Sequence, residues 1–144
     1  MREPGRRAPI TGLSHVQLLV SDVEASARWY GAVLGLVPVA EDPDVGYVAM
    51  KHPDAKFVVV LTRGPVPSNG PRESASEHLD HLAFAVPDGN SLGAWARHLA
   101  DIGIDHAGIV LEDGRPSLQL RDPDGTAIEL VAPSAPSAAP PIGS

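Results

Sequence analysis

Two histidines and one glutamate in this sequence are spaced so that together they could bind a metal ion. His15 and His81 lie 66 positions apart, and each opens a short apolar segment typical of a strand. Glu129 stands between Ile128 and Leu130 in a third such segment. A glutamate is almost never fully buried unless it is paired or bound to a metal. Two neutral imidazoles and one carboxylate that converge from strands form a facial triad, which leaves about three coordination positions for water or substrate.

Each of these residues has an ordinary explanation when it is taken alone. A single histidine on an apolar strand is more often a hydrogen-bonded core or rim residue than a ligand. Glu129 could face water from an edge strand. The combination favours the metal site, because the two histidines occupy the same position in two copies of a repeat and the carboxylate lies in the last strand of the second copy.

The two halves of the chain repeat each other. A shift of 66 positions superposes pairs of identical residues, among them His15 and His81, Val20 and Val86, Asp22 and Asp88, and Trp29 and Trp95. Each half begins with a strand, continues with a helical apolar stripe at i, i+3, i+7 and i+10, and ends with three short strand candidates. We therefore predict an α+β fold of two pseudo-symmetric βαβββ modules whose sheets form an open, cup-like barrel.

The elements can be bounded from the same patterns. The stripe of the first helix is Ser26, Trp29, Val33 and Leu36, and Ser21 with Glu24 forms a capping box at its start. The later strand candidates are 37–41, 46–50 and 56–62 in the first half, and 106–111, 117–121 and 127–131 in the second.

Alternation along the strands assigns their faces. Leu18 and its alternate neighbours Val16 and Val20 suit packing under the helix, which leaves His15 and Gln17 on the opposite, open face. In the second half His81, Ala83 and Ala85 take the open face, and the two small alanines leave space there.

Composition sets the domain limits. We expect a basic arm over 1–9, the first module over 10–63, a Pro-, Ser- and Gly-rich linker over 64–78, the second module over 79–132 and a disordered tail over 133–144.

Charge and residue usage exclude several functions. The chain carries 11 basic and 18 acidic residues, a net charge of −7, which argues against nucleic acid or anionic lipid as the main partner. The absence of cysteine excludes disulfides and thiolate sites. No stretch approaches the roughly 20 apolar residues that span a bilayer. We expect a cytoplasmic protein with no nucleic-acid or membrane partner.

Four motifs resemble those of the vicinal oxygen chelate superfamily: Gly-Leu-Ser-His-Val, Trp-Tyr-Gly-Ala-Val-Leu-Gly-Leu, Leu-Asp-His-Leu-Ala-Phe-Ala-Val and Arg-Asp-Pro-Asp-Gly-Thr-Ala-Ile-Glu-Leu. That superfamily includes glyoxalase I, extradiol dioxygenases, fosfomycin-resistance enzymes, methylmalonyl-CoA epimerase and bleomycin-binding proteins. The resemblance implies the glyoxalase/dioxygenase fold, a small-molecule substrate with adjacent oxygens, and a homodimer, with or without exchange of modules. Its metal positions match His15, His81 and Glu129, for one divalent ion, with Fe(II) favoured and Mn, Zn, Ni or Co as alternatives.

A fourth ligand, which glyoxalase I carries on the last strand of its first module, is absent. Aligning His52-Pro-Asp-Ala55 with Asp122-Pro-Asp-Gly125 sets Val59 opposite Glu129, and a slip of one residue gives Val58 or Val60. All three are valine, which disfavours glyoxalase I itself.

The resemblance therefore favours an Fe(II) extradiol-type dioxygenase. The alternatives are a metal-assisted isomerase, epimerase or lyase, and a non-catalytic drug-binding resistance protein. The dioxygenases' acid–base histidine falls near Lys56, which is otherwise a solvated residue, and their active-site tyrosine falls near Gln119. Further candidates for substrate binding are Gln17, Tyr47, Arg63 and Arg121, whereas His52, His78 and His106 are expected at the surface or rim.

Overall fold

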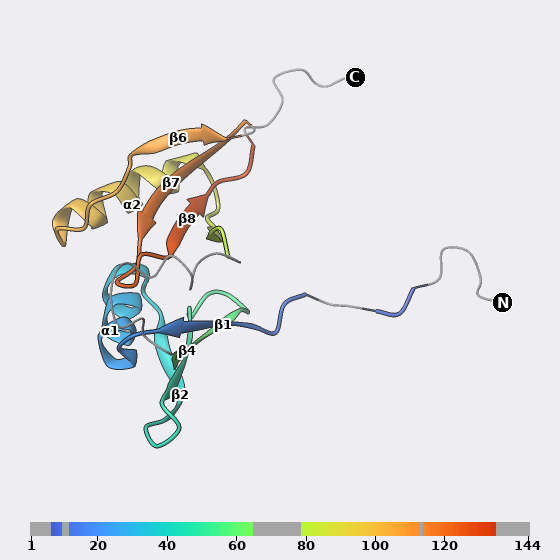
Figure 1. Ribbon diagram of the computed structural model, residues 1–144. Helices are drawn as coiled ribbons and strands as arrows, with labels where there is room; N and C mark the ends of the chain where they lie inside the picture. The colour runs from blue at the N-terminus through green and yellow to red at the C-terminus, as the bar shows by residue number, and fades with distance from the viewer. Residues whose placement is uncertain (1–6, 10–11, 65–78, 113, 135–144) are drawn as a thin grey trace.

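The computed structural model describes residues 7–9, 12–64, 79–112 and 114–134. Most of the predicted arm at 1–9, of the linker at 64–78 and of the tail at 133–144 lies outside the described residues. The remainder forms two modules, one drawn from blue to green and the other from yellow to red in Figure 1.

The two modules have the same topology. Module 1 comprises β1 (His15–Val20), α1 (Val23–Leu34), β2 (Val37–Asp42), β3 (Tyr47–Lys51) and β4 (Val58–Arg63). Module 2 comprises β5 (Leu82–Ala85), α2 (Gly89–Asp101), β6 (Ile109–Glu112), β7 (Arg115–Arg121) and β8 (Ala127–Val131). The sheet orders are β1-β4-β3-β2 and β5-β8-β7-β6, with the first pair of each sheet parallel. The predicted fold class is confirmed, and the two sheets of the chain remain open (Figure 1).

The strand faces follow the predicted alternation. Leu18 and Val20 are buried in module 1, whereas His15 and Gln17 are exposed. In module 2, Val86 is buried at the end of the corresponding run. Since successive side chains of a strand point to opposite faces, each sheet presents one apolar face to the core and leaves the other open.

The start of α1 differs from the prediction. Ser21 and Glu24 do not form a capping box, because the N-cap is Asp22, whose carboxylate accepts from the Ala25 N–H at 2.9 Å. Asp88 caps α2 in the same way through the backbone N–H three residues on, also at 2.9 Å. The sequence placed two suitable capping residues side by side, and the second one starts the helix.

The strand predicted at 106–111 begins later, at Ile109. Gly108 has a positive φ of 92°, and its N–H donates to Nδ1 of His106 at 3.0 Å. This turn extends the loop after α2 to 102–108, whereas the corresponding loop of module 1 is only 35–36.

A buried hydrogen bond joins the two modules. The hydroxyl of Tyr30 on α1 donates to Oδ2 of Asp122, in the turn between β7 and β8, at 2.7 Å. The other carboxylate oxygen accepts from the N–H groups of Asp124 and Thr126, each at 2.9 Å. Burial raises the pKa of both Tyr30 and Asp122. The predicted stripe assigned this inner position to Trp29, but Tyr30 is fully buried and Trp29 is only half-buried.

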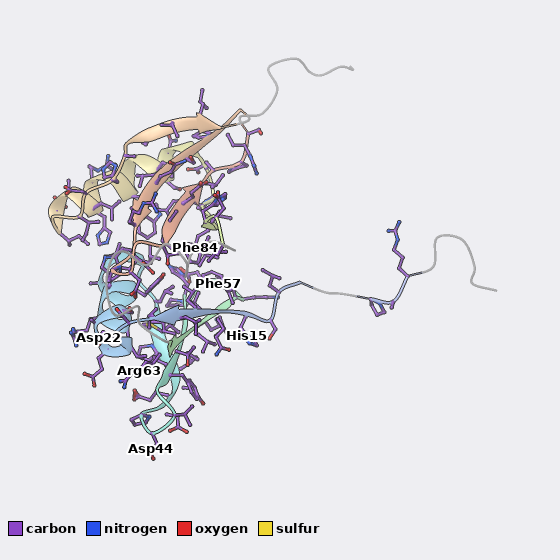
Figure 2. All side chains as sticks on the ribbon, viewed as in Figure 1. His15, Asp22, Asp44, Phe57, Arg63 and Phe84 are labelled. Carbon is purple, nitrogen blue, oxygen red and sulfur yellow. The ribbon has the colours of Figure 1, made fainter. Side chains whose placement is uncertain are left out.

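Apolar contacts reinforce this junction. The rings of Phe57 and Phe84 lie 5.2 Å apart at the boundary between the modules, where Figure 2 shows them side by side. His98 on α2 donates from Nε2 to the Val33 carbonyl on α1 at 3.0 Å. Buried side chains of both modules belong to one hydrophobic cluster, so the modules pack as a unit. Within the described residues, no helix is long and apolar enough to cross a membrane.

Replacing Tyr30 by Phe removes the hydroxyl that donates to Asp122 and keeps the buried ring. We expect the free energy of unfolding to fall by about 1.5 to 3 kcal/mol, because a buried carboxylate loses one of its donors. Urea unfolding at neutral pH measures the change. The matched control is Tyr47→Phe at the half-buried start of β3, for which we expect a change within about 0.5 kcal/mol. Equal losses in both variants would contradict the role given to the Tyr30 hydroxyl.

Candidate metal centre

Glu129 lies at the centre of the sheet of module 2. Its strand, β8, is flanked by β5 and β7, and Glu129 pairs with Ala83 on one side and Gln119 on the other. Its neighbours Ile128 and Leu130 are buried in the core, so the carboxylate points to the open face. The residue is nevertheless only 8% exposed. The edge-strand explanation is therefore wrong for Glu129.

His81 stands beside this carboxylate, directly before β5. Its Nε2 lies 3.7 Å from Oε2 of Glu129, and its Nδ1 lies 2.8 Å from Oδ2 of Asp80. A carboxylate without a proton can only accept, so Nδ1 of His81 carries the hydrogen in this contact. In the neutral ring the lone pair is then on Nε2, the atom that faces Glu129.

The donor set of module 2 fits a metal ion. Two ligand atoms bound at roughly 2.1 Å to one ion lie about 3 Å apart at a right angle and about 4.2 Å apart when opposite. The 3.7 Å between His81 Nε2 and Glu129 Oε2 falls within that interval. Imidazole nitrogen with carboxylate oxygen suits iron, manganese or zinc.

His15 does not join this pair within the chain. It is the first residue of β1 in module 1, exposed, and Figure 2 shows it well away from the sheet of module 2. Within the part of the chain that the structure describes, no group of three His, Cys, Asp or Glu residues could hold a metal ion. The structure thus brings together His81 and Glu129, two of the three ligands that the sequence suggested.

The two histidines share one local arrangement. Oγ of Ser14 lies 3.0 Å from Nδ1 of His15, as the Asp80 carboxylate lies beside Nδ1 of His81. In both modules, the side chain of the residue that precedes the histidine thus contacts Nδ1 of its ring. Such contacts orient a ligating histidine and fix which nitrogen meets the metal.

Strand register identifies the module 1 counterpart of Glu129. In module 1, Val60 of β4 pairs with Gln17 on β1 and with Ala49 on β3. In module 2, Glu129 of β8 pairs with Ala83 on β5 and with Gln119 on β7, the corresponding strands. The turn before β4 has one residue more than the turn before β8. Aligning the two turns therefore set Val59 opposite Glu129, whereas the strand register gives Val60. Module 1 therefore has valine where module 2 has its carboxylate.

Two hollows border Glu129. One, of about 590 Å³, is lined by His81, Ala83, Ser117 and Glu129 among others. Ser117 is 1% exposed, and its hydroxyl has no hydrogen-bond partner among the described residues. A buried hydroxyl without a partner carries a desolvation cost that a bound ligand could relieve. Sequence reasoning missed Ser117, although alternation from Gln119 places it on the same face.

The second hollow, of about 500 Å³, contains Gln119, Arg121 and Glu129 together with Trp29 and His106. Gln119 thus lies beside the carboxylate. His106 was predicted to begin a strand and to lie at the surface or rim, so the sequence did not place it near Glu129. The long loop after α2 brings it into this hollow. The guanidinium of Arg121 donates from Nη1 to the Gly125 carbonyl at 2.8 Å.

The remaining candidates belong to module 1. Gln17 is exposed on the open face of β1, two residues beyond His15. Lys56 is exposed and precedes β4. Arg63 pairs with Val20, at the opposite end of β1 from His15, and Tyr47 lies near that end too. Arg63 and Tyr47 are therefore remote from the strand end that carries the histidine.

Comparison with known proteins identifies the fold. The model of the Glyoxalase/Bleomycin resistance protein/Dioxygenase superfamily matches residues 12–130. A crystal structure of a glyoxylase/bleomycin resistance protein/dioxygenase domain from Frankia sp. EAN1pec superposes with a TM-score of 0.75 at 24% identity, covering 90% of this chain and 96% of that one.

Two curated relatives carry names of different reactions. "Glyoxylase I 4" of Arabidopsis thaliana is 27% identical over 89% of this chain, which spans 74% of that protein. "Biphenyl-2,3-diol 1,2-dioxygenase 3" of Rhodococcus globerulus is 33% identical over 82% of this chain, which spans only 61% of that protein. The similarity to named enzymes therefore does not select one reaction.

The contact between Asp80 and His81 predicts a tautomer. In Asp80→Ala, we expect the share of neutral His81 with hydrogen on Nδ1 to fall, because the acceptor that holds this hydrogen is removed. Nitrogen-15 NMR of the imidazole ring at a pH where it is neutral measures the ratio. Asp101→Ala, at the end of α2, is the matched control and leaves the ratio unchanged. An unaltered ratio in Asp80→Ala would show that Asp80 does not orient the ring.

Proposed function

Since the chain belongs to the Glyoxalase/Bleomycin resistance protein/Dioxygenase superfamily, we propose that it is a metal-dependent enzyme acting on a small substrate with two adjacent oxygens. Within that class we propose an Fe(II) extradiol-type dioxygenase. The observation that carries the proposal is the pairing of His81 Nε2 with the buried Glu129 carboxylate at 3.7 Å on an open sheet face.

The proposed ligands are His81, Glu129 and His15. A buried carboxylate next to an imidazole that presents its lone pair is an arrangement suited to a divalent cation. His15 is proposed on its matching position in the repeat and on the matching contact at its Nδ1.

The valine at position 60 supports a three-ligand site. Its counterpart in module 2 is Glu129, so the open face of module 1 has no carboxylate at the corresponding place. An octahedral ion with three protein ligands keeps three positions, enough for both oxygens of a chelating substrate and for one more molecule. When bound, Fe(II) supplies Lewis acidity toward the substrate oxygens and redox chemistry with O₂.

The chain's own residues would bind and orient the substrate from both sides of Glu129. The Ser117 hydroxyl is placed to take up a substrate hydrogen bond, which would satisfy a buried group that has no other partner among the described residues. Gln119 pairs with Glu129 and lines the second hollow, where its amide can donate to a substrate oxygen.

A metal-assisted isomerase is the second candidate, and the 27% identity to the glyoxylase I relative over 89% of this chain favours it. It would use the same ligands, with the metal as a Lewis acid. The two reactions differ in their need for O₂.

The function is tested by metal content and by turnover. We expect protein purified without chelator to contain a divalent metal, and the iron-loaded protein to consume O₂ in proportion to substrate within a panel of catechols. A parallel anaerobic panel contains hydroxyacyl and thiohemiacetal substrates. Turnover in that panel alone would replace the dioxygenase with the isomerase, and protein that takes up no metal would support a binding protein instead.

Glu129→Gln tests the carboxylate. We expect metal content and metal-dependent turnover to be lost, because the amide keeps the size of the side chain but not the charge that balances a divalent cation. The melting temperature should match that of the metal-free wild type. Glu41→Gln on β2, an exposed carboxylate, is the matched control and keeps the metal. Full metal occupancy in Glu129→Gln would make the carboxylate structural.

We also propose that the chain forms a homodimer. Large apolar side chains are exposed on module 1, among them Leu19 on the open face of β1 at 52%. A partner that covers this face would remove them from water.

A further inference from the structure

A third hollow, of about 290 Å³, lies between the two modules, and we call it the junction hollow. Module 2 lines it with Trp95 of α2 and Leu130 of β8, and module 1 lines it with His52 and Phe57. Leu130 directly follows Glu129 on the same strand, so the two side chains point to opposite faces of the sheet. The junction hollow is therefore on the helix side of that sheet, separate from the proposed metal centre.

Aromatic rings form the apolar wall of the junction hollow. The ring centroids of Phe57 and Phe84 lie 5.2 Å apart, with the rings tilted by 44° (Figure 2). Trp95 joins them from α2. All three rings pack against the shared core, yet none of them is fully buried. A further flat ring would bury the apolar surface that they leave exposed. A closed apolar cavity of roughly 150 Å³ already holds benzene in other proteins, so the size suits a small substituted ring.

Two polar groups at the junction hollow determine what such a ring can carry. The N–H of Asp54 donates to Nδ1 of His52 at 3.1 Å. Because a backbone N–H can only donate, the neutral ring has its lone pair on Nδ1 and its hydrogen on Nε2. His52 thus offers a donor, and the exposed carboxylate of Asp54 offers an acceptor. A phenolic hydroxyl suits both groups, since it can accept and donate, whereas an anionic ligand would be repelled by Asp54.

We propose that the junction hollow is a second ligand site, which binds a small neutral phenol. Its ring lies against Phe57, Phe84 and Trp95, and its hydroxyl accepts a hydrogen bond from Nε2 of His52. Since both modules line the hollow, the bound ring fills space between them and adds contacts to their junction. The site requires neither the metal nor the proposed reaction.

The two tryptophans of the chain report separately on the two candidate sites. Trp95 lines the junction hollow, and Trp29 lines the hollow beside Glu129. Their indole N–H signals in proton–nitrogen-15 NMR spectra are assigned with Trp29→Phe and Trp95→Phe. Protein treated with chelator is then titrated with phenol. We expect the Trp95 signal to shift and to saturate at phenol concentrations that leave the Trp29 signal in place.

His52→Asn tests the hydrogen bond to the ligand. Asparagine still accepts from the Asp54 N–H but has no group in place of Nε2–H. We expect the affinity for phenol to fall about five- to tenfold, the effect of one lost neutral hydrogen bond. The affinity for benzene should not change.

His106→Asn is the matched control. Nδ1 of His106 also accepts from the backbone N–H two residues further on, at 3.0 Å, but His106 lines the hollow beside Glu129. This variant should leave the phenol titration of Trp95 unchanged. A comparison of ligands on the wild type needs no variant: benzoate should bind more weakly than phenol, because its charge would lie beside Asp54.

A saturable Trp95 shift that His52→Asn weakens for phenol and not for benzene supports the second site. A phenol response that does not saturate, or that appears at Trp29 alone, overturns it. Unchanged phenol affinity in His52→Asn, an equal loss for benzene, or benzoate binding as tight as phenol overturns the assigned ligand class. All of these results are obtained without metal or turnover, so they leave the proposed function to its own tests.

Discussion

The buried hydrogen bond from Tyr30 to Asp122 holds the two halves of this protein together. It links the helix of module 1 to the turn that ends β7, and two backbone N–H groups fix the carboxylate from the other side. Tyr30 also belongs to the apolar core that the two modules share. The opposite faces, with His15 and Glu129, have no further helix or strand layer over them among the described residues.

Short-range patterns were enough to predict most elements and the face on which each side chain lies. A strand has a side-chain period of two, so Leu18 and Val20 had to lie opposite His15 and Gln17, and Glu129 had to lie opposite Ile128 and Leu130. Where two neighbouring residues were equally suitable, the sequence could not choose. Asp22 rather than Ser21 caps α1. Tyr30 rather than Trp29 takes the buried position, where its hydroxyl bonds to Asp122 of module 2.

The arrangement of the two modules relative to each other could not be predicted from the sequence, for a different reason. The repeat predicts two copies of one topology, but it is silent on which faces of the copies meet. That choice depends on long-range contacts such as Phe57 with Phe84 and His98 with the Val33 carbonyl, which join positions far apart in the chain. Ser117 was overlooked because a serine in a strand carries no chemical signal until its burial and missing partner are known.

The unequal loops after the two helices have a consequence for how the protein arose. The loop of module 1 is 35–36 and that of module 2 is 102–108, and only the longer one brings His106 and its neighbours to the hollow beside Glu129. Module 1 also has Val60 in place of the carboxylate. An ancestral duplication would have given both halves the same loop and the same residue at the position of Val60 and Glu129, so the two copies have since diverged in these features. Under the proposed function, the second half can change its loop to suit a new substrate while the first half keeps His15.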